Sequence, residues 1–187
     1  MNLLESGREY FPALLAEINS AQREIFLETY IFAADPVGEA VATALAAAAS
    51  RGVSVQLLVD GFGGRNFADD FLPRLVAAGV YAMLYRPELA RFNFRRNRLR
   101  RLHRKLAVID ARVAFVGGIN IVDDDNAPPG LRPRYDYAVR VEGPVLFRRL
   151  LAPVGGMHVR PPAGQHEALA GLDQVRDRAD LGHRRDD

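Results

Sequence analysis

A short stretch in the middle of the chain contains residues whose types and spacing suit phosphate chemistry. In HRKLAVID a histidine and a lysine stand two residues apart, and VGGIN follows after a short interval. The residues of interest are His103, Lys105, Asp110, Gly117, Gly118 and Asn120. A histidine can act as a nucleophile or an acid–base group, and a lysine supplies a fixed positive charge. With a neutral amide donor, they could stabilise negative charge on phosphoryl oxygens during transfer.

The lysine of this stretch is unusual within the chain. Lys105 is one lysine among 25 cationic residues, and the other 24 are arginines. This usage favours a need for a compact point charge rather than merely a positive side chain. The competing interpretation is a solvated His-x-Lys pair, because exposure is the usual state of a lysine.

Two strands are expected to bring these residues together. KLAVID and VAFVGG alternate like strands, and the three-residue break between them predicts an antiparallel hairpin centred on Ala111. That register sets Lys105 opposite Gly117 and places His103 on the same strand and the same face as Lys105. The two glycines of VGGIN would leave room for a ligand and expose backbone N–H groups. Asp110 would lie at the turn.

The first half of the chain alternates helical and strand periods. Apolar spacing predicts helices near 6–18, 36–51 and 67–78, and β-branched and aromatic runs predict strands at 24–32, 53–60 and 80–85. After the hairpin, a strand is expected at 135–141 and a helix at 144–151. This alternation predicts the α/β class, with a mixed, mostly parallel sheet and flanking helices.

Length and composition fit one globular domain of ordinary type. The chain has 187 residues, of which 49% are hydrophobic and 26% charged, and it contains no cysteine. A chain without cysteine has no disulfide, thiolate nucleophile or Cys-ligated metal site. No apolar run is long enough for a transmembrane helix. Apolar periodicity fades after residue 153, so we expect a domain at 1–151 and an irregular, poorly ordered tail at 152–187.

The formal charge of +2 conceals a strongly basic band. Residues 86–112 hold ten basic and two acidic side chains, a net charge of +8, which leaves −6 for the remainder. The arginines of this band that we expect to contact an anionic surface are Arg95, Arg96, Arg98, Arg100 and Arg101. Such a band could contact the anionic headgroups of a membrane surface, bind nucleic acid, or form a solvated loop. Its position directly before His103 favours a role in gathering an anionic substrate.

The spacing of these residues resembles the extended HKD signature of the phospholipase D superfamily. The matching positions are His103-x-Lys105, Asp110 and Gly117-Gly118-x-Asn120. The segments LLESGREYFPALLAEINSAQREIFLETYIF, DGFGG and YDYAVRVEGPV are similar to the first catalytic half of bacterial cardiolipin synthases. The resemblance extends over residues 1–151 and implies a phospholipase D-like α/β sandwich half, with no metal and no organic cofactor.

The same resemblance implies a two-step phosphatidyl transfer. His103 would attack the phosphodiester phosphorus to form a phosphohistidine, or would act as the acid–base partner of the attacking histidine. Lys105, Asn120 and the two motif glycines would bind the phosphoryl oxygens. Asp110 would complete the catalytic motif in a largely structural role, and Asp136 would orient the histidine ring.

The family pattern requires two HKD motifs that face each other, and this chain has one. Two chains could pair so that both copies of His103 meet at a symmetric interface. The chain could instead be the front half of a longer enzyme that has lost its second motif by truncation or a shifted reading frame. The abrupt end of the family pattern after Leu151 favours this second interpretation.

We therefore expect a cardiolipin synthase-like phosphatidyltransferase that acts on a phosphatidylglycerol-like lipid. It would be a peripheral protein at the cytoplasmic side of the cell membrane. Two alternatives stay open. One is a homodimeric, single-motif phosphodiesterase or nuclease that acts on nucleic acid. The other is a non-catalytic module that binds anionic lipid.

Overall fold

The computed structural model describes residues 1–85, 101–127 and 130–143. All the described residues belong to one compact unit, Met1–Leu150. The helix predicted at 144–151 and the tail predicted at 152–187 lie outside the described residues. The same holds for four arginines of the basic band, namely Arg95, Arg96, Arg98 and Arg100.

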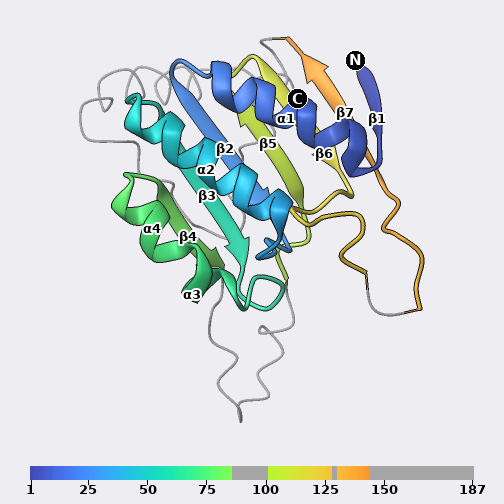
Figure 1. Cartoon of the computed structure of the whole chain (residues 1–187). Coiled ribbons are helices and arrows are strands. Elements are labelled where there is room, and N and C mark those ends of the chain that lie inside the picture. The colour runs from blue at the N-terminus through green and yellow to red at the C-terminus, as the bar shows by residue number, and fades with distance from the viewer. Residues whose placement is uncertain (86–100, 128–129, 144–187) are drawn as a thin grey trace, which may run out of the picture. The chain divides into compact units, whose positions relative to one another are not determined.

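The described strands form one seven-stranded sheet in the order β1-β7-β6-β5-β2-β3-β4. The strands are β1 (Asn2–Glu5), β2 (Glu24–Thr29), β3 (Ser54–Asp60), β4 (Tyr81–Tyr85), β5 (Lys105–Ile109), β6 (Val113–Gly117) and β7 (Tyr137–Glu142). β5 lies in the middle of the sheet, between β6 and β2 (Figure 1). All of its residues are buried. The central strand therefore places Lys105, its first residue, between two neighbouring strands.

Most strand pairs are antiparallel, so the prediction of a mostly parallel sheet is wrong. β2, β3 and β4 run parallel, whereas the pairs β2–β5, β5–β6, β6–β7 and β1–β7 are antiparallel. The alternation of helix and strand in the sequence applies only to the parallel part. The later strands are joined by a hairpin and a loop, which reverse the chain without a crossover helix. The predicted mixed α/β fold is confirmed.

The helices are α1 (Ser6–Ser20), α2 (Pro36–Ser50), α3 (Phe67–Asp70) and α4 (Leu72–Ala77). α1 and α2 lie across the same face of the sheet (Figure 1) and bury the main core against it. Leu14 and Ile18 of α1 and Val41 and Leu45 of α2 are fully buried, as their helical spacing predicts. Of the helices described, none has the length and apolarity that a membrane crossing requires.

Proline and a capping side chain set two of the helix boundaries. At the start of α2, Asp35 accepts a hydrogen bond from the N–H of Gly38 at 2.9 Å, as expected for Asp followed by Pro. Pro73 has no N–H to bond to the carbonyl four residues earlier. The helix predicted at 67–78 is accordingly divided at Phe71 into α3 and α4.

The β5–β6 hairpin has the predicted register. Lys105 pairs with Gly117, and the turn is centred on Ala111. The ladder ends at this pair, because the N–H of Gly118 donates instead to the carbonyl of Tyr137 in β7, at 2.9 Å. His103 therefore precedes the strand, and its predicted place on the strand beside Lys105 is wrong.

Candidate active site

Lys105 is a buried cation at the start of β5. Lys105 is 6% exposed, so the interpretation of this lysine as solvated is wrong. Nζ donates to the carbonyl of His103 at 3.2 Å and lies 5.6 Å from the centre of the Tyr30 ring. Burial lowers the pKa of Lys105, and the negative charge of Asp136 opposes that decrease. An ammonium has three N–H donors, so the bond to one carbonyl leaves donors for an anion.

His103 is exposed, and its backbone is anchored on the preceding side. The N–H of Leu102 donates to the buried carboxylate of Asp60 at 2.8 Å. The imidazole packs against Tyr30, with 5.2 Å between the ring centres. An exposed imidazole on an anchored backbone can reach a phosphodiester outside the core.

Asn120 lies in a loop that is fixed to the ends of β2 and α2. Its Oδ1 accepts the N–H of Ile31 at 3.0 Å, so the side-chain NH₂ is the group that could bind a phosphoryl oxygen. Asp35 accepts the N–H of Asp123 at 2.8 Å and the side-chain NH₂ of Asn126 at 2.9 Å. These bonds hold the Asn120 loop against the N-terminus of α2.

Gly117 and Gly118 do not leave the open space that the sequence predicted. A Cβ atom on Gly117 would lie 2.3 Å from the carbonyl oxygen of Tyr137, and one on Gly118 would lie 2.2 Å from Oδ1 of Asp136. The N–H of Gly118 is bonded to β7. The glycines are needed because β7 and a carboxylate approach them closely. Their contact with phosphate stays a prediction.

The carboxylate of Asp136 affects the pKa of Lys105. This carboxylate packs over Gly118, and Oδ1 accepts the N–H of Tyr137 at 2.8 Å. Its negative charge raises the pKa of Lys105 against the effect of burial. The role of Asp136 in orienting the ring of His103 stays a prediction.

A cavity of about 280 Å³ opens beside these residues. Gly118, Asn120 and Asp136 line it together with Arg134 and Tyr135. Three of the predicted site residues thus share one cavity, and its walls carry several groups able to form hydrogen bonds.

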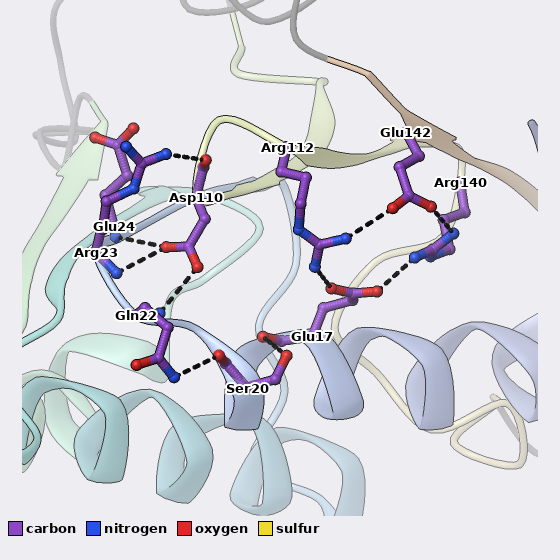
Figure 2. Close-up of polar contacts among 9 residues, drawn as sticks. All are labelled: Glu17, Ser20, Gln22, Arg23, Glu24, Asp110, Arg112, Arg140 and Glu142. Carbon is purple, nitrogen blue, oxygen red and sulfur yellow. Dashed lines mark hydrogen bonds and ion pairs between the residues drawn. The ribbon is translucent and has the colours of Figure 1, made fainter.

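Asp110 lies at the opposite end of β5 from Lys105, about 17 Å away along the strand. Its carboxylate accepts the N–H groups of Gln22, Arg23 and Glu24 at 2.9, 2.8 and 3.0 Å (Figure 2). Partial burial would raise the pKa of Asp110, but these bonds and the charge of Arg23 hold it below its ordinary value. Asp110 thus joins the hairpin turn to the start of β2. Its part in the catalytic motif stays a prediction.

Arg101 is the member of the predicted anion-contacting set that the structure describes. Its guanidinium lies 4.9 Å from the centre of the Phe62 ring, and that of Arg65 lies 4.4 Å from the same centre. One exposed phenyl ring thus gathers two cations next to the segment that carries His103.

No role was predicted from the sequence for Tyr30, Asp60 or Glu28. Glu28 is buried in β2 and forms an ion pair with Arg104 at 2.6 Å. Burial raises the pKa of Glu28, and Arg104 acts in the opposite direction. The acid inside the apolar run EIFLETYIF and the aspartate at the end of VSVQLLVD were available signals. Their partners lie 76 and 42 residues away, beyond any local pattern.

The groups gathered at this end of β5 are an exposed imidazole, a buried ammonium and a fixed amide. Together they can attack the phosphorus of a phosphodiester and bind its oxygens. Within the described ranges, no group of three or more histidine or acidic side chains is placed to hold a metal ion.

Comparisons with known proteins identify relatives with lipid-synthesis names. Residues 14–151 match the family model described as cardiolipin synthase, PLD-like domain. Cardiolipin synthase B of Escherichia coli (strain K12) is 45% identical over 146 residues, covering 78% of this chain and 35% of that protein. The major cardiolipin synthase ClsA of Bacillus subtilis (strain 168) is 35% identical over 138 residues, covering 73% and 28%. The chain thus spans about a third of the length of these curated relatives.

A solved structure has the same fold. Nuc from Salmonella typhimurium, a phospholipase D family member, aligns with a TM-score of 0.54 and 19% identity. The alignment covers 96% of this chain and 93% of Nuc. At 19% identity this likeness shows a shared fold. The family assignment depends on the family model, which matches residues 14–151. With His103, Lys105 and Asn120 brought to one end of the sheet, the chain belongs to the cardiolipin synthase PLD-like domain family.

Proposed function

We propose that this chain is one catalytic half of a phosphatidyltransferase that forms cardiolipin from a phosphatidylglycerol-like lipid. The observation that carries the proposal is the exposed His103 beside the buried Lys105. The domain that holds them is 45% identical to a protein named cardiolipin synthase B. The nucleophile is His103, and the ammonium of Lys105 and the amide of Asn120 stabilise the phosphoryl oxygens.

The proposed reaction has two displacement steps. In the first, an imidazole nitrogen of His103 attacks the phosphorus of one lipid, and the bond from phosphorus to the headgroup oxygen breaks. A general acid gives a proton to that oxygen, and glycerol leaves. In the second, the headgroup hydroxyl of another lipid returns a proton to the same group and attacks phosphorus, which breaks the phosphorus–nitrogen bond. Two phosphatidylglycerol molecules thus give one cardiolipin and one glycerol.

The general acid of this scheme is a second histidine from a second HKD motif. This sequence contains one such motif. Another copy of the chain, joined through a symmetric interface, can supply the second histidine. The remaining part of a longer protein can supply it equally well.

The proposed substrate is a membrane lipid, so the proposal includes a peripheral position at the cytoplasmic side of the cell membrane. Arg65 and Arg101 support it, because cations on an exposed aromatic ring attract anionic headgroups. The net charge of +8 in residues 86–112 also favours binding to anionic headgroups.

Incubation of the purified protein with phosphatidylglycerol vesicles and, in parallel, with DNA tests this proposal. We expect cardiolipin and glycerol in equal amounts, intact DNA, and loss of product in His103→Gln. Glu17→Gln is the matched control, because Glu17 forms ion pairs at the other end of the sheet. Strand cleavage without cardiolipin would identify a phosphodiesterase or nuclease instead. Vesicle binding with neither product would identify a non-catalytic lipid-binding module.

A further inference from the structure

Asp60 is a buried carboxylate that the proposed reaction does not use. It is the last residue of β3, and its exposed fraction is 0%. A carboxylate without water is stable in a core only when other groups donate hydrogen bonds to it. Its donors therefore show which parts of the chain it holds in place.

The donors to Asp60 come from two segments. Oδ1 accepts the N–H groups of Phe62 at 2.9 Å and Gly63 at 3.3 Å, which shapes the turn after β3. Oδ2 accepts the N–H of Leu102 at 2.8 Å, from a segment 42 residues away. This second bond fixes the backbone immediately before His103, where the ladder of β5 has not yet begun.

The turn shaped by Asp60 also supports the ring that contacts the imidazole. A Cβ atom on Gly63 would lie 2.2 Å from the carbonyl oxygen of Tyr30 and 3.1 Å from its ring atom Cδ1. The turn is therefore packed directly against Tyr30. The ring of Tyr30 in turn contacts both His103 and Lys105. Asp60 is thus connected to His103 by two sets of contacts, one through the N–H of Leu102 and one through the ring of Tyr30.

We propose that Asp60 is a positioning residue for His103, acting through the Leu102 N–H and through the Tyr30 ring. It keeps the imidazole nitrogen where it can attack phosphorus in line with the leaving oxygen. The inference rests on the proposed function and assigns a role to a residue remote from the HKD motif. Displacement of an attacking atom by about 1 Å lowers a rate about 100-fold. Binding of the substrate by Lys105 and Asn120 would continue.

Asp60→Asn tests the inference with little change in side-chain shape. The variant replaces one acceptor oxygen with an NH₂ group, which cannot accept from a backbone N–H. The substrate is a p-nitrophenyl phosphodiester, whose phenolate leaves without a proton, and the assay follows phenolate release. We expect the maximal rate to fall about 10- to 100-fold, with KM changed by less than about threefold. The matched control Glu17→Gln is expected to keep both values.

A second readout does not depend on turnover. The chain has four histidines, and the imidazole Cε1–H signal of His103 is assigned by its loss in His103→Gln. We expect this signal to shift or broaden in Asp60→Asn and to stay in place in Glu17→Gln. If Asp60→Asn does not fold, Tyr30→Leu removes the contact through the ring, and the same fall in rate is expected. Only the rate is compared in Tyr30→Leu, because loss of the aromatic ring itself shifts the His103 signal.

An unmoved His103 signal and an unchanged rate in a folded Asp60→Asn protein, or an unchanged rate in a folded Tyr30→Leu protein, would overturn the positioning role. The outcome for the proposed function is separate. A wild-type protein that releases no phenolate, and whose His103 signal still responds to Asp60→Asn, would refute the proposed chemistry and support the positioning role.

Discussion

Lys105 is a buried lysine whose ammonium group contacts a carbonyl and lies near an aromatic ring. It is 6% exposed, and its Nζ lies between the carbonyl of His103 and the ring of Tyr30. An ammonium in this position has lost most of its hydration, so a bound phosphoryl group restores part of the lost interaction. This gives a physical reason for a lysine at this position, the one lysine of the chain.

Lys105→Arg is expected to lower the rate of transfer about 100-fold. The guanidinium keeps the charge, but it is wider and planar, so we expect it to lose the position that the ammonium holds beside the His103 carbonyl and the Tyr30 ring. The measurement is the maximal rate with phosphatidylglycerol vesicles, after circular dichroism has shown that the variant is folded. A variant with at least a third of the wild-type rate would refute the need for a compact charge.

The pH profile of kcat/KM provides a test of the Lys105–Asp136 interaction. Lys105 must be protonated to bind an anion, and burial lowers its pKa. The value of kcat/KM is therefore expected to decrease as the pH rises. This decrease should occur at a pH below 10.5, the ordinary pKa of a lysine. Asp136→Asn removes the charge that raises the pKa of Lys105, so this alkaline limb should move to lower pH. A limb that stays in place, or moves to higher pH, would show that Asp136 does not support the lysine.

At the scale of elements, Asp110 joins the β5–β6 hairpin to the start of β2. Asp110→Asn weakens hydrogen bonds from three backbone N–H groups to a charged acceptor (Figure 2). We expect the free energy of unfolding at neutral pH to decrease by about 2 kcal/mol, as measured by urea denaturation.

The stabilisation by Asp110 should depend on pH. Its pKa in the folded state lies below the ordinary value of 3.8. The contribution is therefore fully present above 3.8 and is lost as the pH falls through the lower folded value. The difference in stability between wild type and Asp110→Asn should shrink over that range. A difference that stays constant would contradict the pKa shift.

A network of four charged side chains ties α1 to the sheet on the helix-covered face. Glu17 bonds Arg112 at 2.7 Å and Arg140 at 2.5 Å, and both arginines also bond Glu142 (Figure 2). Glu17→Gln is expected to lower the free energy of unfolding by about 1 kcal/mol at low salt, and by less at about 1 M salt, because salt screens charges. The measurement is urea denaturation at both salt concentrations. An equal loss at both would indicate a packing effect.

Local sequence patterns predict individual elements well and their pairing less well. The hairpin register follows from the symmetry of two strands about Ala111, and the structure confirms it. The antiparallel pairing of β5 with β2 was not predictable, because β5 inserts beside β2 from a distant part of the chain. β1 was missed because NLLE is a short edge segment with little alternation.

The candidate site, like the fold, was predicted in part. The chemical identities of His103 and Lys105 are visible in one short motif, whereas the burial of Lys105 depends on its neighbours in the sheet. Gly118 was interpreted as open space because the carboxylate that fills it comes from Asp136, 18 residues later. Contacts of this kind depend on tertiary packing that a local pattern does not contain.

At the scale of the whole molecule, the proposed reaction uses two histidine motifs, and this sequence supplies one. If two copies form the site, specific activity should rise with protein concentration as dimers form. Addition of excess His103→Gln protein should then lower the activity of a fixed amount of wild type, because mixed dimers hold a single histidine. Light scattering would report the assembly. Wild-type activity that does not change when the variant is added would contradict a site shared between copies.

His103 is expected to carry the phosphoryl group as a covalent intermediate. A p-nitrophenyl phosphodiester tests this directly, because its leaving group requires no general acid and one motif suffices for the first step. After an alkaline quench, mass spectrometry should find a phosphoryl adduct on the peptide that contains His103. In the first turnover, one phenolate should be released for each adduct formed. An adduct on His158, His166 or His183, or phenolate release with no adduct on His103, would contradict the assignment of His103 as the nucleophile.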